Sequence, residues 1–130
     1  MFPVNGIVAV STQRTVEQAA ETLASLIEAK NLILFARIDF AADAARAGLV
    51  MNPSQLFIFG NPQAGTPLMQ AAPTIALDLP LKVLVWQEDG GQVWLSYNAT
   101  SYLQARHDAP AELMKAIDGI GALVQAAAAG

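Results

Sequence analysis

The segment from Gly60 to Pro67, GNPQAGTP, combines residue types that let a backbone approach a ligand closely. It follows an apolar run and precedes a helical pattern. The first N–H groups of a helix lack partners within it and the dipole there is positive, which favours a phosphate or carboxylate. Gly60 and Gly65 permit close approach, while Thr66 can cap the helix with Pro67 at its first position. The segment lacks the GK[ST] ending of a Walker loop, and the alternative to ligand binding is a tight strand-to-helix connection in which Thr66 caps its own helix.

Acid–base chemistry has a second set of candidate residues. His107 is the sole histidine of the chain, so it could serve as a general base but not in a multi-histidine metal site. Its alternative role is a hydrogen bond at a helix end. Asp39, Asp78 and Lys82 are charges within apolar runs. Because charges are rarely buried unpaired, we expect Lys82 to meet one of these carboxylates, either for proton transfer or as a structural ion pair.

Composition excludes several other kinds of chemistry. The 130 residues include no cysteine, which removes disulfides, thiolate catalysis and cysteine-based metal sites. The net charge is −4 and the seven lysines and arginines are scattered, whereas a nucleic-acid binder needs clustered cations. No stretch approaches the roughly 20 apolar residues of a membrane span, and the start lacks the pattern of a signal peptide. We therefore expect a cytoplasmic protein without metal, cofactor, membrane or nucleic-acid partner.

The elements that must position these residues follow from hydrophobic periodicity. Apolar residues at three- and four-residue steps predict a first helix from Thr12 to Lys30, with Thr15 to Gln18 as an alternative capping box one turn later. Asp39 can cap a short helix over 41–47 that ends at Gly48. The apolar run Leu56 to Phe59 predicts a central strand covered on both faces. Further strands are expected at 7–10, 32–38, 81–86 and 93–98.

The second half of the chain is punctuated by turn residues. A helix near Thr66 to Ala72 should stop at Pro73, and Glu88 to Gly91 predicts a hairpin turn. A short helix over 101–106 and a last helix from about Pro110 complete the pattern, with a frayed tail at 126–129. This order of elements predicts one α+β domain over 1–130, with a mixed or antiparallel sheet of four to five strands and helices packed on it.

Several segments, in the same order along nearly the whole chain, resemble the Domain of Unknown Function 302 family. They are FARID at 35–39, LFIFGNP at 56–62, AGTPLM at 64–69, ALDLPLK at 76–82, VWLSYN at 93–98, YL at 102–103 and RH at 106–107. The resemblance implies a single α+β domain that often assembles as a dimer, and it implies no agreed activity. Many members carry a histidine after the Ile–Asp pair, where this chain has Phe40. The lack of that histidine weakens the case for a catalytic role of the segment around Asp39 and Phe40.

Three functions follow from these observations. The first is a dimeric domain without catalysis that binds a small molecule, with anions among the candidates, through Gly60, Asn61, Gly65, Thr66, Lys82 and Tyr97. Its anionic end would meet the backbone N–H groups of Gly65 to Leu68. The second is a small acid–base enzyme using His107, or Lys82 with Asp39 or Asp78. The third is a structural or partner-binding subunit. A homodimer is expected because 54% of the residues are hydrophobic and few charges cover the surface.

Overall fold

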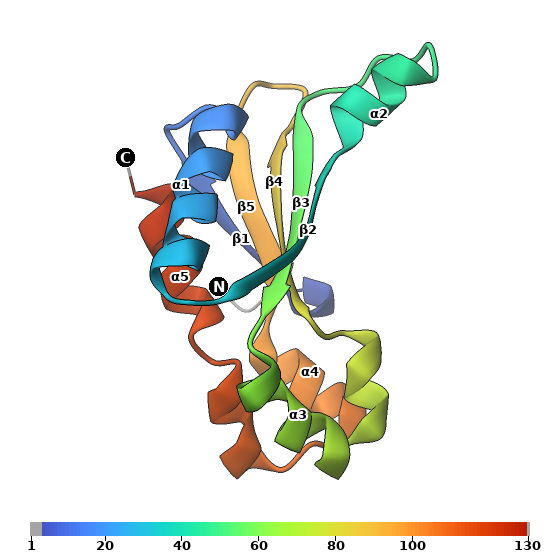
Figure 1. The fold of residues 1–130 in the computed structure, drawn as a ribbon. Coiled ribbons are helices and arrows are strands. Elements are labelled where there is room, and N and C mark those ends of the chain that lie inside the picture. The colour runs from blue at the N-terminus through green and yellow to red at the C-terminus, as the bar shows by residue number, and fades with distance from the viewer. Residues whose placement is uncertain (1–3, 130) are drawn as a thin grey trace.

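The computed structural model describes residues 4–129, which form a five-stranded antiparallel sheet with helices packed against it (Figure 1). Residues 1–3 lie outside this range, and they belong to the N-terminal segment for which the sequence predicted no signal peptide. The strand order is β1-β5-β4-β3-β2, so β3 and β4 lie inside the sheet as expected. The α+β prediction is confirmed. The strands are β1 (Ile7–Thr12), β2 (Ile33–Asp39), β3 (Ser54–Gly60), β4 (Leu81–Gln87) and β5 (Val93–Asn98).

The helices divide into a layer on the sheet and a cluster at one end of it. α1 and α5 cover one face, and α3, α4 and two 3-10 segments gather beyond the ends of the strands (Figure 1). None of the helices described over 4–129 is long and apolar enough to cross a membrane. The helices are α1 (Val16–Ala29), α2 (Phe40–Arg46), α3 (Pro62–Ala71), α4 (Thr100–His107) and α5 (Ile120–Ala128), with 3-10 segments η1 (Val4–Gly6), η2 (Pro73–Leu77) and η3 (Ala111–Ala116).

The main core lies between the sheet and the α1–α5 layer. Alternate residues of the central strands point to this layer, so Phe57 and Val83 are fully buried side by side in register. α1 contributes one apolar stripe, in which Leu23 and Ile27 are buried. A second core joins α3, η2, α4 and η3 through Leu68, Ala72, Ile75, Leu103, Ala109, Met114 and Ile117. This second core fixes the helical cluster at the end of the sheet.

The ends of the first two helices show which capping signals the chain uses. α1 starts at Val16, because Thr15 accepts from the Gln18 N–H and the Gln18 side chain accepts from Thr15. The predicted start at Thr12 is wrong, since Thr12 ends β1 and donates to the Ala128 carbonyl at 2.7 Å, and the alternative capping box at Thr15 is confirmed. Asp39 caps α2 as predicted, by accepting from the Ala42 N–H at 2.9 Å.

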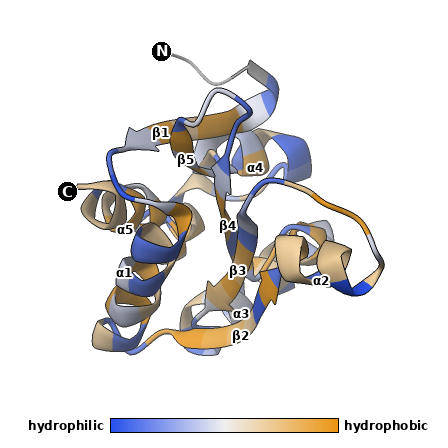
Figure 2. Ribbon diagram, turned by 90° about the horizontal axis from the view of Figure 1, so that it is seen from above, coloured by the Kyte–Doolittle hydropathy of each residue, from blue (hydrophilic) through white to orange (hydrophobic). Residues whose placement is uncertain are grey.

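The other face of the sheet corrects the expectation for β3. Phe57 and Phe59 are buried under the helices, but Leu56 and Ile58 point to the opposite face and remain partly exposed. α1 and α5 lie on the far side of the sheet from this face, and α2 lies on its side (Figure 2). The apolar run predicted that both faces of this strand are covered. That prediction is wrong for a single copy of the chain, because the helices described over residues 4–129 cover only one face. Ile58 therefore does not belong to the core.

The end of the chain differs from its prediction in two ways. The expected single last helix is split into η3 and α5, with Gly119 between them. Glycine lowers helix stability by about 1 kcal/mol relative to alanine, and this chain has Gly119 and Gly121 within three residues. The expected frayed tail is wrong as well, because Ala127 and Ala128 lie in α5 and are buried.

Candidate functional site

A small apolar cavity lies where β3 runs into α3, between the end of the sheet and the helical cluster. Its volume is about 170 Å³. Gly60, Asn61, Gly65 and Thr66, four of the six residues proposed from sequence, belong to its lining. The rest of the lining is apolar and comes from the start of β2, from β3 and α3, from the η2–β4 connection and from the end of η3: Leu32, Phe35, Phe59, Pro62, Met69, Leu79, Pro80, Leu81, Ala116 and Ile117.

Neither Gly60 nor Gly65 is required in this lining to avoid a steric clash of a Cβ atom with its neighbours. A Cβ added at Gly60 would lie 3.6 Å from the Pro80 Cβ and 3.9 Å from Phe35 Cε2, which is ordinary contact. A Cβ at Gly65 would meet nothing within 4 Å. The space beside Gly65 is therefore open to a ligand or to a larger side chain.

The start of α3 lies one turn earlier than the sequence suggested. Asn61, not Thr66, is the N-cap, and its Oδ1 accepts from the Gln63 N–H at 3.0 Å. Pro62 then takes the first helical position, where its missing N–H costs nothing. The predicted helix from Thr66 is wrong in its first residue, because Thr66 lies inside α3.

This change removes the donors expected for an anion. The N–H groups of Ala64 and Gly65 donate to the Asn61 carbonyl at 3.0 and 2.9 Å. Thr66 and Leu68 lie within the helix, where N–H groups bond to the preceding turn. The prediction that Gly65 to Leu68 would offer unpaired backbone donors is therefore wrong. What remains at this place is an apolar cavity.

The two other residues proposed for this site lie elsewhere. Lys82 pairs with Ile58 in register on the open face of the sheet, and its Nζ donates to the Pro80 carbonyl at 3.2 Å. Tyr97 points to the α5 side, where a Cβ at Gly121 would lie 3.3 Å from its hydroxyl. Burial raises the pKa of this hydroxyl above its usual value near 10.0. Neither side chain lines the cavity.

The expected ion pair of Lys82 with a carboxylate is not formed among the described residues. Asp39 is occupied as the cap of α2. Asp78 instead contacts two cationic or titratable side chains at the end of α4. Arg106 Nη1 donates to both of its carboxylate oxygens, at 2.9 and 3.1 Å, and His107 Nε2 lies 2.5 Å from Oδ2.

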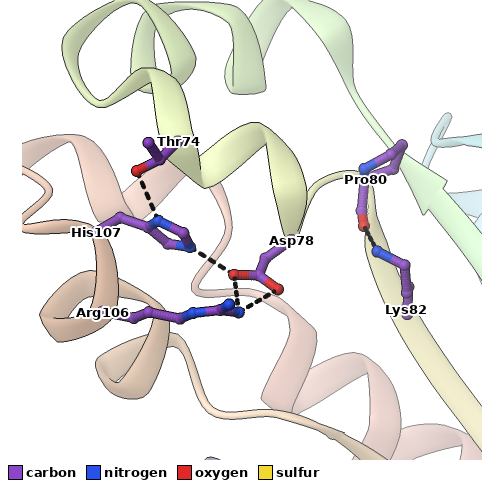
Figure 3. A network of polar contacts seen from close by, with 6 residues as sticks. All are labelled: Thr74, Asp78, Pro80, Lys82, Arg106 and His107. Atoms are coloured by element: carbon purple, nitrogen blue, oxygen red, sulfur yellow. Dashed lines mark hydrogen bonds and ion pairs between the residues drawn. The ribbon is translucent and has the colours of Figure 1, made fainter.

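A four-residue network results, formed by Thr74, Asp78, Arg106 and His107 (Figure 3). Thr74 Oγ1 lies 2.8 Å from His107 Nδ1, so the imidazole is held between a hydroxyl and a carboxylate. The side chain of His107 is 3% exposed and that of Asp78 is 14% exposed, whereas Arg106 is half exposed. We name this set the Thr74–His107 network.

Local structure brings the Thr74–His107 network together. Thr74 lies in the first turn of η2 and Asp78 is its C-cap, so both project from one short segment. Arg106 and His107 form the last turn of α4, which packs on η2 through the second core. Sequence reasoning identified Asp78 and His107 separately but missed their contact and the part of Thr74. One sequence signal could have shown this: Thr74 and Asp78 lie four residues apart directly after Pro73, a spacing that puts both side chains on one short helical segment.

The architecture defines the class of protein: an α+β domain with one helix-covered sheet face and a helical cluster at one end. The chain belongs to the family described as Domain of unknown function DUF302, which matches residues 8–127. The resemblance seen in the sequence is confirmed. The crystal structure of an uncharacterized conserved protein DUF302 from Bacillus stearothermophilus has a TM-score of 0.76, covering 96% of this chain and 97% of that one. At 16% identity this likeness shows the fold alone.

Two similar proteins come from Brucella species. Two proteins named Fluoride-specific ion channel FluC 1, from Brucella suis biovar 1 (strain 1330) and Brucella abortus biovar 1 (strain 9-941), are each 42% identical over 103 residues. The matched region is 79% of this chain but only 41% and 38% of those proteins. The chain thus spans about two fifths of their length, and the channel name describes the whole relatives.

Proposed function

We propose that this domain binds a small, largely uncharged molecule in the cavity beside Gly65 and carries out no chemistry on it there. The observation that supports this function is the cavity itself, at the place the loop GNPQAGTP marked in the sequence. A space of about 170 Å³ is smaller than a typical drug-sized pocket but large enough for a molecule near the size of benzene. Asn61 and Thr66 are the polar groups available to orient it.

The charge of the ligand follows from the lining. Among residues 4–129, no lysine, arginine or histidine belongs to the lining, and the first N–H groups of α3 are already bonded to Asn61. An anion placed here would lose its hydration without gaining a charged partner. The anionic ligand considered from the sequence is therefore replaced in this proposal by an apolar one.

A thermal-shift titration with indole or benzene tests this function. We expect the wild-type melting temperature to rise with ligand concentration, because a ligand that binds the folded state stabilises it. Gly65→Leu should abolish the rise by filling the cavity. Gly90→Leu is the matched control, since a Cβ at Gly90 also meets nothing within 4 Å but lies in the β4–β5 turn.

Sodium fluoride provides the anion arm of the same titration, since the Brucella relatives are named for that ion. It should shift the melting temperature no more than sodium chloride at equal ionic strength. A rise with indole that persists in Gly65→Leu would place the ligand elsewhere. A rise specific to fluoride would contradict the apolar ligand.

Acid–base catalysis at His107 is a second candidate function, because a specific contact supports it. Its imidazole is buried and lies 2.5 Å from Asp78 Oδ2, which fits a base oriented by a carboxylate. The alternative that used Lys82 loses its support, since Lys82 meets a backbone carbonyl.

We also propose a homodimer, which combines the first function with the third alternative of a partner-binding subunit. The loop after α2 carries Leu49, Val50 and Met51, which are 65%, 100% and 46% exposed, and it appears as an apolar stretch in Figure 2. It adjoins the open sheet face with Leu84 and Trp86. Burying this surface against a second copy would remove it from water. The cytoplasmic location expected from the sequence stays a prediction.

A further inference from the structure

The Thr74–His107 network has the geometry of a nucleophile, a general base and a group that orients the base. Thr74 Oγ1 lies 2.8 Å from His107 Nδ1, and His107 Nε2 lies 2.5 Å from Asp78 Oδ2. The first distance is within the range of about 2.6–3.2 Å in which an imidazole activates a hydroxyl, and the second is a short contact that holds the imidazole against the carboxylate. The network therefore contains, in one chain of contacts, the three roles needed for acyl transfer.

The hydrogen bonds define which imidazole nitrogen can act as base. The Asp78 carboxylate, which accepts two contacts from Arg106 Nη1, accepts a third from His107 Nε2–H. In the neutral imidazole this leaves the lone pair on Nδ1, which accepts from the Thr74 hydroxyl. The tautomer required of a general base is thus the one that the carboxylate stabilises.

Exposure divides the network in a way that suits a reaction at the surface. Thr74 is exposed, whereas the side chain of His107 is 3% exposed and that of Asp78 14%. Thr74 is thus the member of the network that a substrate can approach from solvent, while the base and the carboxylate are buried together. A network that served only to join η2 to α4 would need the His107–Asp78 contact but not an exposed hydroxyl on the other nitrogen.

We propose that Thr74 is the nucleophile of a site that hydrolyses small activated carboxylic esters, with His107 as general base and Asp78 as a positioning residue. The proposal develops the second candidate function and is independent of ligand binding in the cavity. The geometry that carries it is the Thr74–His107–Asp78 chain of contacts.

The reaction has two balanced halves. Thr74 Oγ1 attacks the ester carbonyl carbon while its proton passes to His107 Nδ1, and the alcohol leaves with that proton as the C–O bond breaks. Water then attacks the acyl-Thr74 ester and gives a proton to His107 Nδ1, which returns it to Thr74 Oγ1 as the carboxylic acid is released. One ester and one water give one acid and one alcohol, with no redox change.

The test uses p-nitrophenyl acetate and the whole protein. We expect release of p-nitrophenol above the rate of the urea-denatured protein, and an acetyl group on Thr74 in peptide mass mapping after an acid quench. Thr74→Val should lose both signals, and Thr74→Ser should restore them. His107→Gln should lower the rate about 100-fold or more, the range of general-base catalysis. Asp78→Asn should lower kcat with little change in KM.

Two results would overturn the proposal. One is wild-type protein without acetyl-Thr74, whatever the variants do. The other is an unchanged rate in Thr74→Val, which would make the imidazole or a lysine the acceptor. Thr74→Val should keep its thermal response to indole, so failure here and failure of the cavity function are separate outcomes. Melting curves of each variant confirm that a lost signal is not a lost fold.

Discussion

Tyr97 shows how the place of one side chain makes the stability of the fold depend on pH. It lies on the covered face of β5 next to α5, and burial raises the pKa of its hydroxyl above 10.0. The neutral form is favoured in the folded state. The contribution of the neutral Tyr97 hydroxyl to the free energy of unfolding is therefore complete below about pH 10. It is lost as the pH rises through the higher pKa that the hydroxyl has in the folded state.

We predict that Tyr97→Phe removes this alkaline loss. The wild-type free energy of unfolding should fall above pH 10 more steeply than that of Tyr97→Phe, when both are measured by urea titration at a series of pH values. Identical alkaline slopes for the two proteins would show that Tyr97 ionises equally well in the folded chain.

The residues of both sites were partly predictable for a physical reason. Asp78 stood out because a charged group within an apolar run needs a partner, and His107 because it is the sole histidine; both do have partners. Which partners they have depends on how α4 packs on η2, and a single sequence contains no such long-range pairing. Lys82 illustrates the failure: the same argument predicted a carboxylate, but a carbonyl two residues away satisfies its ammonium group.

At the scale of elements, α3 shows two competing start signals in one loop. Asn61-Pro62 and Thr66-Pro67 each place a capping residue before a proline. Only the later pair was recognised from the sequence as a helix start. The chain uses the earlier pair and keeps Pro67 within the helix. Pro67 removes one hydrogen bond from the helix, while Leu68 beside it is buried in the second core.

The two caps can be distinguished by matched alanine variants. Asn61→Ala should lower the free energy of unfolding by about 1 kcal/mol, because the Gln63 N–H loses its acceptor. Thr66→Ala should leave it nearly unchanged, since Thr66 is exposed inside α3. Urea unfolding of both variants is the measurement. A larger loss in Thr66→Ala than in Asn61→Ala would contradict the start of α3 at Pro62.

At the scale of the whole molecule, composition and order of elements were enough to predict an α+β domain with β3 and β4 inside the sheet. They were not enough to predict that one face stays open. Consecutive apolar residues such as Leu56 to Phe59 indicate that both faces avoid water, but not whether a helix of the same chain or another molecule covers the second face. That ambiguity is the basis of the proposed dimer.

The dimer can be tested at the loop after α2. We predict that Val50→Glu raises the dimer dissociation constant at least tenfold in sedimentation equilibrium, since burying a valine contributes roughly 1.5–3 kcal/mol and a tenfold change is about 1.4 kcal/mol. Leu77→Glu is the control, because Leu77 is 73% exposed but lies on η2, at the opposite end of the sheet (Figure 1). A monomeric wild type at micromolar concentration would remove the proposal, as would equal dissociation in both variants.

The pairing of β1 with β5 has a consequence for the chain during its synthesis. β1 is an edge strand whose partner among the described strands comes only in the last third of the sequence, and Thr12 bonds to Ala128 across 116 residues. Until β5 and α5 have left the ribosome, the apolar side of β1 and the part of α1 that packs on α5 have no partner. Nascent chains that end before Val93 should thus expose aggregation-prone, protease-sensitive segments. Native structure should form late in synthesis and in one cooperative step.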